Sequence, residues 1–167
     1  MRDDRVQRGR GAYQRGSYPE EKTLDQLWPG YLTGGYFGPD GNLKPELVSR
    51  EKVDSLVSEM GKARPSLTSH QLRRFFSHCR AIEARLKANL SRASRWSAEV
   101  AEFRKLDVAA ADGYGKSSRK IPKLFHDFVE QNVAAVKTEK DFLEGFLPHF
   151  EALVGFGAQH LRERERN

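Results

Sequence analysis

The side chains of this sequence best suited to bind a ligand are the arginines and lysines between residues 68 and 95. Seven cations and one carboxylate occur there, a charge of +6 that equals the net charge of the whole 167-residue chain. Guanidinium groups bind phosphates through several hydrogen bonds at once. This composition favours a polyanionic partner and predicts nucleic-acid binding. The residues concerned are Arg73, Arg74, Arg80, Arg85, Lys87, Arg92 and Arg95, against Glu83.

The spacing of these cations predicts rows of positive charge along a helix. Arg73, Arg80 and Lys87 recur every seven residues, which places them in one stripe with a rise of ~10.5 Å per step. Arg74, Arg85 and Arg92 form a second row. A solvated helix face is the alternative interpretation, but such faces usually mix charges of both signs. The stripe therefore favours contact with an RNA backbone without reading of base edges.

A second basic segment lies inside a motif that resembles a phosphate-binding loop. Residues 110–117 read A-A-D-G-Y-G-K-S, a permissive match to that loop. A phosphate-binding loop follows a buried strand, whereas the residues before this motif have helical spacing, so we reject nucleotide hydrolysis. Lys116, Arg119 and Lys120, beside Tyr114, are predicted instead to contact RNA phosphates from a basic loop.

Other chemistry is not indicated by the sequence. The five histidines share no spacing typical of metal ligands, and Cys79 lies on an apolar helix face, where we expect a small buried residue. Glu83 points toward the same face, and we expect it to pair with a basic residue of another helix. We predict no catalytic residue, no metal site and no cofactor, and therefore no enzyme.

Apolar residues recur at helical spacing throughout the chain, and no segment alternates as a strand does. Thr68 and Gln71 form a predicted capping box at the start of the arginine-rich helix. We expect a break near residues 91–94, a helix after Pro122, a last helix capped by Thr138, and a kink at Pro148. A shorter helix is expected at 45–60, before Gly61. The inward face of the arginine-rich helix is predicted to contain Leu72, Phe75, Phe76, Cys79, Ile82, Leu86 and Leu90.

The fold class is thus predicted to be all-α, a small helical bundle with a disordered basic N-terminal tail. Residues 1–25 are rich in Arg and Gly with few aliphatic residues and form the expected tail, and residues 26–167 form a single helical-bundle domain. The sequence has neither the apolar segment of a signal peptide nor a run long enough for a membrane span. We expect a cytoplasmic protein without membrane contact.

The start of the arginine-rich helix, L-T-S-H-Q-L-R-R-F-F followed by R-A-I-E, resembles the small subunit of type III-A CRISPR-Cas effector (Csm) complexes. G-Y-F-G-P-D-G-N-L-K-P-E-L-V and F-L-P-H-F-E-A-L-V are similar to flanking segments of that family. The resemblance spans about residues 35 to 156. It implies a helical bundle without catalytic activity, in which Arg73 and Arg74 fall on basic signature positions and the Tyr114 loop on a basic inter-helix loop.

The resemblance also implies partners: guide RNA, target RNA, other Cas subunits, and further copies of the chain that stack along the RNA groove. Two hypotheses of different classes remain at this point. The first is a non-catalytic RNA-binding structural subunit of a type III-A interference ribonucleoprotein. The alternative is a helical protein–protein interaction adaptor that makes no direct contact with RNA. Salt-sensitive, sequence-tolerant RNA binding would favour the first, and RNA-independent complex formation the second.

Overall fold

Helices make up the fold in the computed structural model, which describes residues 20–93, 95–115 and 119–164. Within these ranges there is no strand, only two isolated bridges, which confirms the all-α prediction. Residues 1–19 of the predicted tail lie outside the described part. The elements are α1 (Leu24–Leu27), the 3₁₀ helix η1 (Pro45–Val48), the π-helix η2 (Arg50–Asp54), α2 (Ser55–Lys62), α3 (Ser69–Ala88), α4 (Arg95–Tyr114), α5 (Lys123–Ala135), the π-helix η3 (Asp141–Phe146) and α6 (Leu147–His160).

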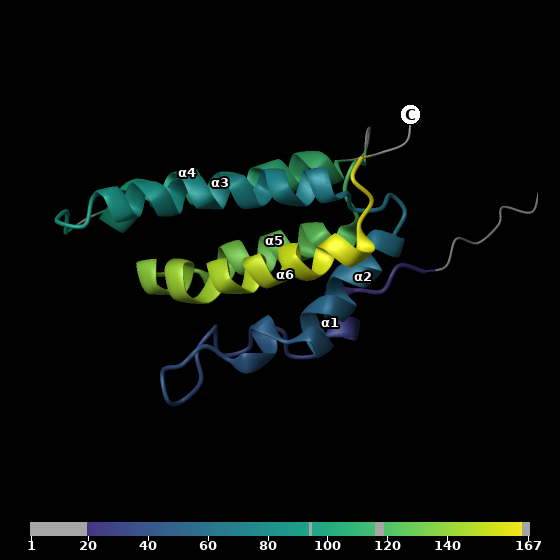
Figure 1. Cartoon of the computed structure of the whole chain (residues 1–167), viewed down its shortest axis with the longest axis horizontal. Coiled ribbons are helices and arrows are strands. Elements are labelled where there is room, and N and C mark those ends of the chain that lie inside the picture. Colours follow the sequence, from purple (N-terminus) through teal and green to yellow (C-terminus); the bar gives the residue numbers. More distant parts are fainter. Residues whose placement is uncertain (1–19, 94, 116–118, 165–167) are drawn as a thin grey trace, which may run out of the picture.

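The helices form stacked layers, as Figure 1 shows. Helices α3 and α4 lie side by side in one layer, and α5 and α6 lie beneath them; α3 contacts α6, and α4 contacts α5. Elements η1, η2 and α2 cover α6, while α1 contacts α5. Helix α1 crosses the tail boundary predicted at residue 25, because Leu24 is buried and Thr23 caps the helix.

Helix α3 begins as its sequence predicts. The Thr68 hydroxyl accepts a hydrogen bond from the Gln71 amide at 3.2 Å, and the Gln71 side chain accepts one from the Thr68 amide at 3.0 Å. The predicted break is also confirmed, because α3 ends at Ala88 and α4 begins at Arg95. Leu90 was wrongly placed in the core: it is 74% exposed because the helix that would turn it inward has already ended.

The core between the layers is mainly aromatic. Phe103 of α4 contacts Phe142 and Phe146 of η3 with ring centroids 5.3 and 5.5 Å apart. Phe146 contacts Phe150, which in turn contacts Phe128 of α5 at 5.6 Å. All five rings are buried. Cys79 is also fully buried, as predicted, and burial raises the pKa of its thiol.

A π-helical segment precedes Pro148, the residue at which a kink was predicted. The Leu147 amide donates to the Phe142 carbonyl, five residues back, immediately before Pro148, which has no amide hydrogen to donate. The segment brings Gly145 against Tyr36, so that a Cβ atom at Gly145 would lie 2.6 Å from Tyr36 Cγ. Tyr36 is thereby packed directly on the last helical segment.

A buried hydrogen-bond network connects residues 31–47 to α5 and α6. His149 is fully buried; its Nδ1 lies 2.5 Å from the Leu47 carbonyl oxygen and its Nε2 lies 2.7 Å from the Tyr31 hydroxyl. Asn132 donates to the Tyr31 hydroxyl at 2.7 Å and accepts from the Tyr36 hydroxyl at 2.8 Å. Burial lowers the pKa of His149 to about 4, so the ring is neutral at pH 7.

Candidate nucleic-acid interface

The predicted stripe on α3 is partly neutralised by its one carboxylate. The Glu83 side chain is 12% exposed and lies 2.5 Å from Arg80 and 2.6 Å from Lys87. The expectation that Glu83 pairs with another helix was wrong, because both partners lie on α3, three residues before it and four after. Arg80 and Lys87 therefore present less free positive charge to a ligand than their spacing suggests.

Two further arginines of the basic segment connect helices instead of facing a ligand. The Arg85 Nε donates to both oxygens of Glu99 on α4, at 3.1 and 3.0 Å, and this hydrogen bonding raises the pKa of Arg85. Arg95 lies 2.5 Å from Glu139 and also donates to the Leu86 carbonyl at 3.0 Å. These contacts join α3 to α4, and the start of α4 to the segment before η3.

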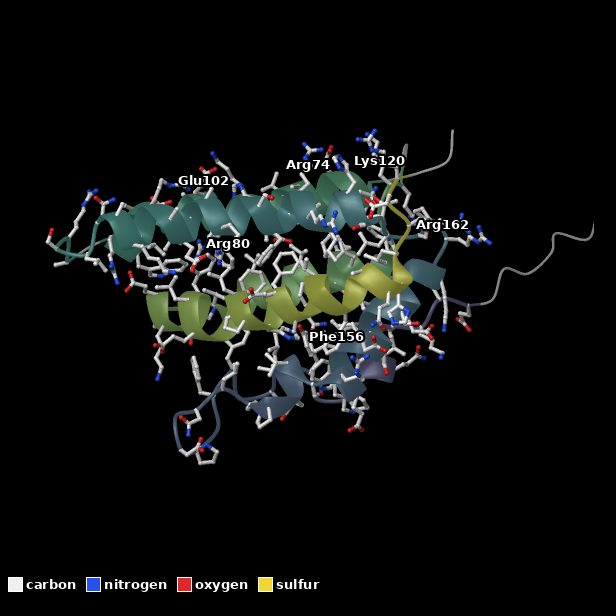
Figure 2. All side chains as sticks on the ribbon, viewed as in Figure 1. Arg74, Arg80, Glu102, Lys120, Phe156 and Arg162 are labelled. Atoms are coloured by element: carbon white, nitrogen blue, oxygen red, sulfur yellow. The ribbon has the colours of Figure 1, made fainter. Side chains whose placement is uncertain are left out.

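The cations that remain available gather where α3 begins. We call this surface the basic end and define it by Arg64, Arg73, Arg74, Arg119, Lys120 and Arg162, all of them exposed. Within the described ranges only Arg73 has a carboxylate in salt-bridge range, the exposed Glu163 at 3.8 Å. Figure 2 shows Arg74, Lys120 and Arg162 at the same end of the molecule.

Hydrogen bonds between distant segments assemble the basic end. The Arg162 carbonyl accepts from the Ser69 amide at 2.7 Å, and the Glu163 carbonyl accepts from the His70 amide at 3.2 Å. The Gln71 side chain donates to the Lys120 carbonyl at 2.8 Å. The beginning of α3, the approach to α5 and the C-terminal segment are thus held together. The contribution of Arg162 to this surface could not be predicted from the sequence, since no local pattern connects Arg162 to Thr68.

The predicted basic loop lies beside a stack of side chains. The Arg119 guanidinium lies 4.4 Å from the centre of the Tyr114 ring, and that ring lies 4.8 Å from the His126 ring. Lys116 lies outside the described residues. Tyr114 is the last residue of α4, so a helix precedes Lys116. This confirms the helical spacing on which the phosphate-binding loop was rejected.

One group of side chains has the composition of a metal site. Potential ligand atoms of His126, Asp127 and Glu130 lie within 4.8 Å of one another. The Lys123 ammonium, however, already pairs with Asp127, and this hydrogen bond raises the pKa of Lys123. Asp127 is therefore already paired with Lys123, and the arrangement gives no support for a metal ion.

Fold and surface together define a small helical protein with an aromatic core and a cluster of exposed cations at one end, most of them without a carboxylate partner within the described ranges. The sequence model of the Csm2 Type III-A family matches residues 48–161, which is more than half of the chain. The chain therefore belongs to the Csm2 Type III-A family. It is a subunit of a type III-A CRISPR effector complex. The family consists of structural subunits, and its partners are other Csm proteins.

Comparison with curated proteins and with solved structures gave no match for this chain. Among the described helices, none combines the length and the apolar character needed to cross a bilayer.

Proposed function

We propose that this chain is a non-catalytic RNA-binding subunit that lines the guide and target RNA groove of the type III-A complex. The observation that carries the proposal is the basic end, where six exposed cations lie together and, among the described residues, only Arg73 has a carboxylate partner, the exposed Glu163. Phosphate contacts supply most of the affinity in sequence-independent binding. Arg73, Arg74, Arg119 and Lys120 are the proposed contacts in the described part, and Lys116 belongs to the same loop.

Arg80 and Lys87 belong to the proposal in a lesser role. Each already neutralises part of the Glu83 charge, at 2.5 and 2.6 Å. An RNA phosphate near them would compete with Glu83 and gain less than at Arg74, which has no such partner within the described ranges. We therefore expect the affinity to depend more on the beginning of α3 than on its middle.

A single chain offers few phosphate contacts, so we propose that copies stack along the RNA in the cytoplasm and form a continuous groove. The isolated chain should then bind single-stranded RNA weakly and without strong sequence preference, because most of the affinity comes from neighbouring subunits. Complex formation that is complete without RNA, together with no RNA binding by the chain, would favour the adaptor hypothesis instead.

The decisive experiment compares two double variants that remove the same charge. Arg74→Ala with Lys120→Ala removes two cations of the basic end, and Arg92→Ala with Arg104→Ala removes two exposed arginines elsewhere. We expect the first pair to weaken single-stranded RNA binding and to reduce the logarithmic salt slope by ~1.4, since each lost contact contributes ~0.7. Equal effects of both pairs would contradict a defined RNA surface at the basic end.

A further inference from the structure

Arg119 contacts an aromatic ring and also lines an open cleft. Its guanidinium packs on the Tyr114 ring at 4.4 Å, and that ring packs on His126. Arg119 also lines a cleft of about 1060 Å³, bounded by residues 20–22, the end of α2 and the start of α5. A planar cation held by a ring and open to a cleft is suited to stacking as well as to phosphate binding.

The cleft has a mixed lining that does not suit phosphate alone. Its carboxylates are Glu20, Glu21 and Glu59, and its cations include Arg64 and Arg119. Glu59 forms salt bridges with Lys22 at 3.8 Å and with Lys62 at 3.6 Å. In Glu21, by contrast, the oxygen Oε1 is buried and has no hydrogen-bond partner among the described residues. A buried acceptor without a donor is costly unless a ligand supplies one.

We propose that this cleft binds one unpaired nucleobase of RNA, stacked on the Arg119 guanidinium with an amino group directed to Glu21. The inference rests on the proposed function, because it assumes that RNA reaches the basic end. Unstacked bases of single-stranded RNA pack on aromatic rings and on arginine planes, and an exocyclic amino group donates to a carboxylate. Arg119 then holds a base in addition to its proposed contact with phosphate, while Arg74 and Lys120 hold phosphates only.

An RNA without bases separates stacking from phosphate contact. The probes are fluorescent oligomers of about twelve nucleotides, oligocytidine and an abasic ribose-phosphate chain of equal length, measured by anisotropy at low salt. We expect the parent protein to bind oligocytidine about tenfold more tightly than the abasic chain, the size of one base stack. Equal affinity for the two oligomers would overturn the proposal while leaving phosphate binding intact. No binding of either oligomer would overturn the proposed function as well.

Arg119→Lys is the matched variant, because it keeps the charge and removes the planar group. We expect it to bind the abasic chain as the parent does and to lose the preference for oligocytidine. Tyr114→Leu should reduce the same preference by removing the ring that supports Arg119. Unchanged helical circular dichroism checks that both variants fold. A preference that survives Arg119→Lys would show that the base does not stack on this side chain.

The contact to Glu21 has its own test in a comparison of oligocytidine with oligouridine. The two bases differ in that cytosine carries an amino group where uracil carries a carbonyl oxygen. We expect the parent to prefer oligocytidine by about ten- to a hundredfold, the effect of one charge-assisted hydrogen bond. Glu21→Gln should lower this preference, because the amide is a weaker acceptor and also presents a donor. Equal binding of the two oligomers by the parent would contradict the Glu21 contact.

Discussion

At the scale of single residues, Glu83 reduces the number of cations on α3 that are available to a ligand. The carboxylate is one charge against seven, yet it is 12% exposed and contacts both Arg80 and Lys87. Low exposure reduces solvent screening of these pairs relative to fully exposed ones. The charge pattern therefore predicted a continuous stripe along α3. In the structure, the part of this stripe that is not paired with Glu83 lies at the beginning of the helix.

Glu83→Gln should release these two cations. We expect affinity for single-stranded RNA at low salt to rise and the logarithmic salt slope to steepen by up to ~1.4, because Arg80 and Lys87 become free to contact phosphates. The free energy of unfolding should change by no more than about 1 kcal/mol. Glu51→Gln is the control, an equal charge change at an exposed residue of η2. An equal gain in the control would show that net charge alone acts.

We expect protonation of His149 at acid pH to lower the free energy of unfolding. Its pKa is about 4 in the folded chain, against an ordinary value of 6.5, because burial disfavours the imidazolium ion. Protons therefore bind the unfolded chain more tightly. The stabilisation is fully present above pH 6.5 and is lost as the pH falls from there toward 4.

We expect the parent to lose about 2 kcal/mol of unfolding free energy between pH 7 and pH 5 through His149. Urea denaturation at both pH values measures this loss. His149→Gln should be less stable at pH 7, because it cannot serve both the Leu47 carbonyl and the Tyr31 hydroxyl, but its stability should depend less on pH. The same pH dependence in parent and variant would show that His149 is not the group that titrates.

At the scale of elements, local sequence signals predicted where helices begin and end. Thr68 and Gln71 form the expected capping box, and the break between α3 and α4 falls at the expected residues. These features depend on a few neighbouring residues, so the sequence contains the information. The prediction that Leu90 is buried was wrong because the apolar spacing to which it belongs continues beyond the point where the helix ends.

Contacts between elements could not be predicted in the same way. Arg85 and Glu99 lie on different helices, and their pairing depends on how α3 and α4 pack. The candidate site was predicted in part: Arg74 and Lys120 lie in the basic end, but the contribution of Arg162 depends on a contact with residues about ninety positions earlier in the chain. Side-chain chemistry gives the kind of site, and packing decides which residues assemble it.

Two glycines of the last helical region test the packing of η3 on Tyr36. Gly145→Ala would place Cβ 2.6 Å from Tyr36 Cγ, and Tyr36 is held by Asn132 at 2.8 Å. We expect a loss of about 1–3 kcal/mol in unfolding free energy from overpacking. Gly155→Ala is the matched variant, since nothing lies within 4 Å of the added atom, and it should gain about 0.5–1 kcal/mol. Urea denaturation compares them, and equal effects would contradict the close contact.

At the scale of the whole molecule, the C-terminal segment completes the basic end. Its carbonyls at Arg162 and Glu163 accept from Ser69 and His70, amides at the start of α3 that have no partner within the helix. The segment after α6 therefore caps α3 and places Arg162 beside the cations of that helix. The same contacts link helical stability to the assembly of the proposed RNA surface.

Deletion of residues 162–167 should uncap α3. We expect the Ser69 and His70 amides to lose protection from hydrogen exchange, and the melting temperature to fall by about 5 °C for two lost hydrogen bonds. The control is the full chain with Arg162→Ala and Arg164→Ala, which removes two cations but keeps both carbonyl acceptors, so its amides should stay protected while RNA binding weakens. Persistent protection of Ser69 and His70 in the shortened chain would show that the C-terminal segment does not cap α3.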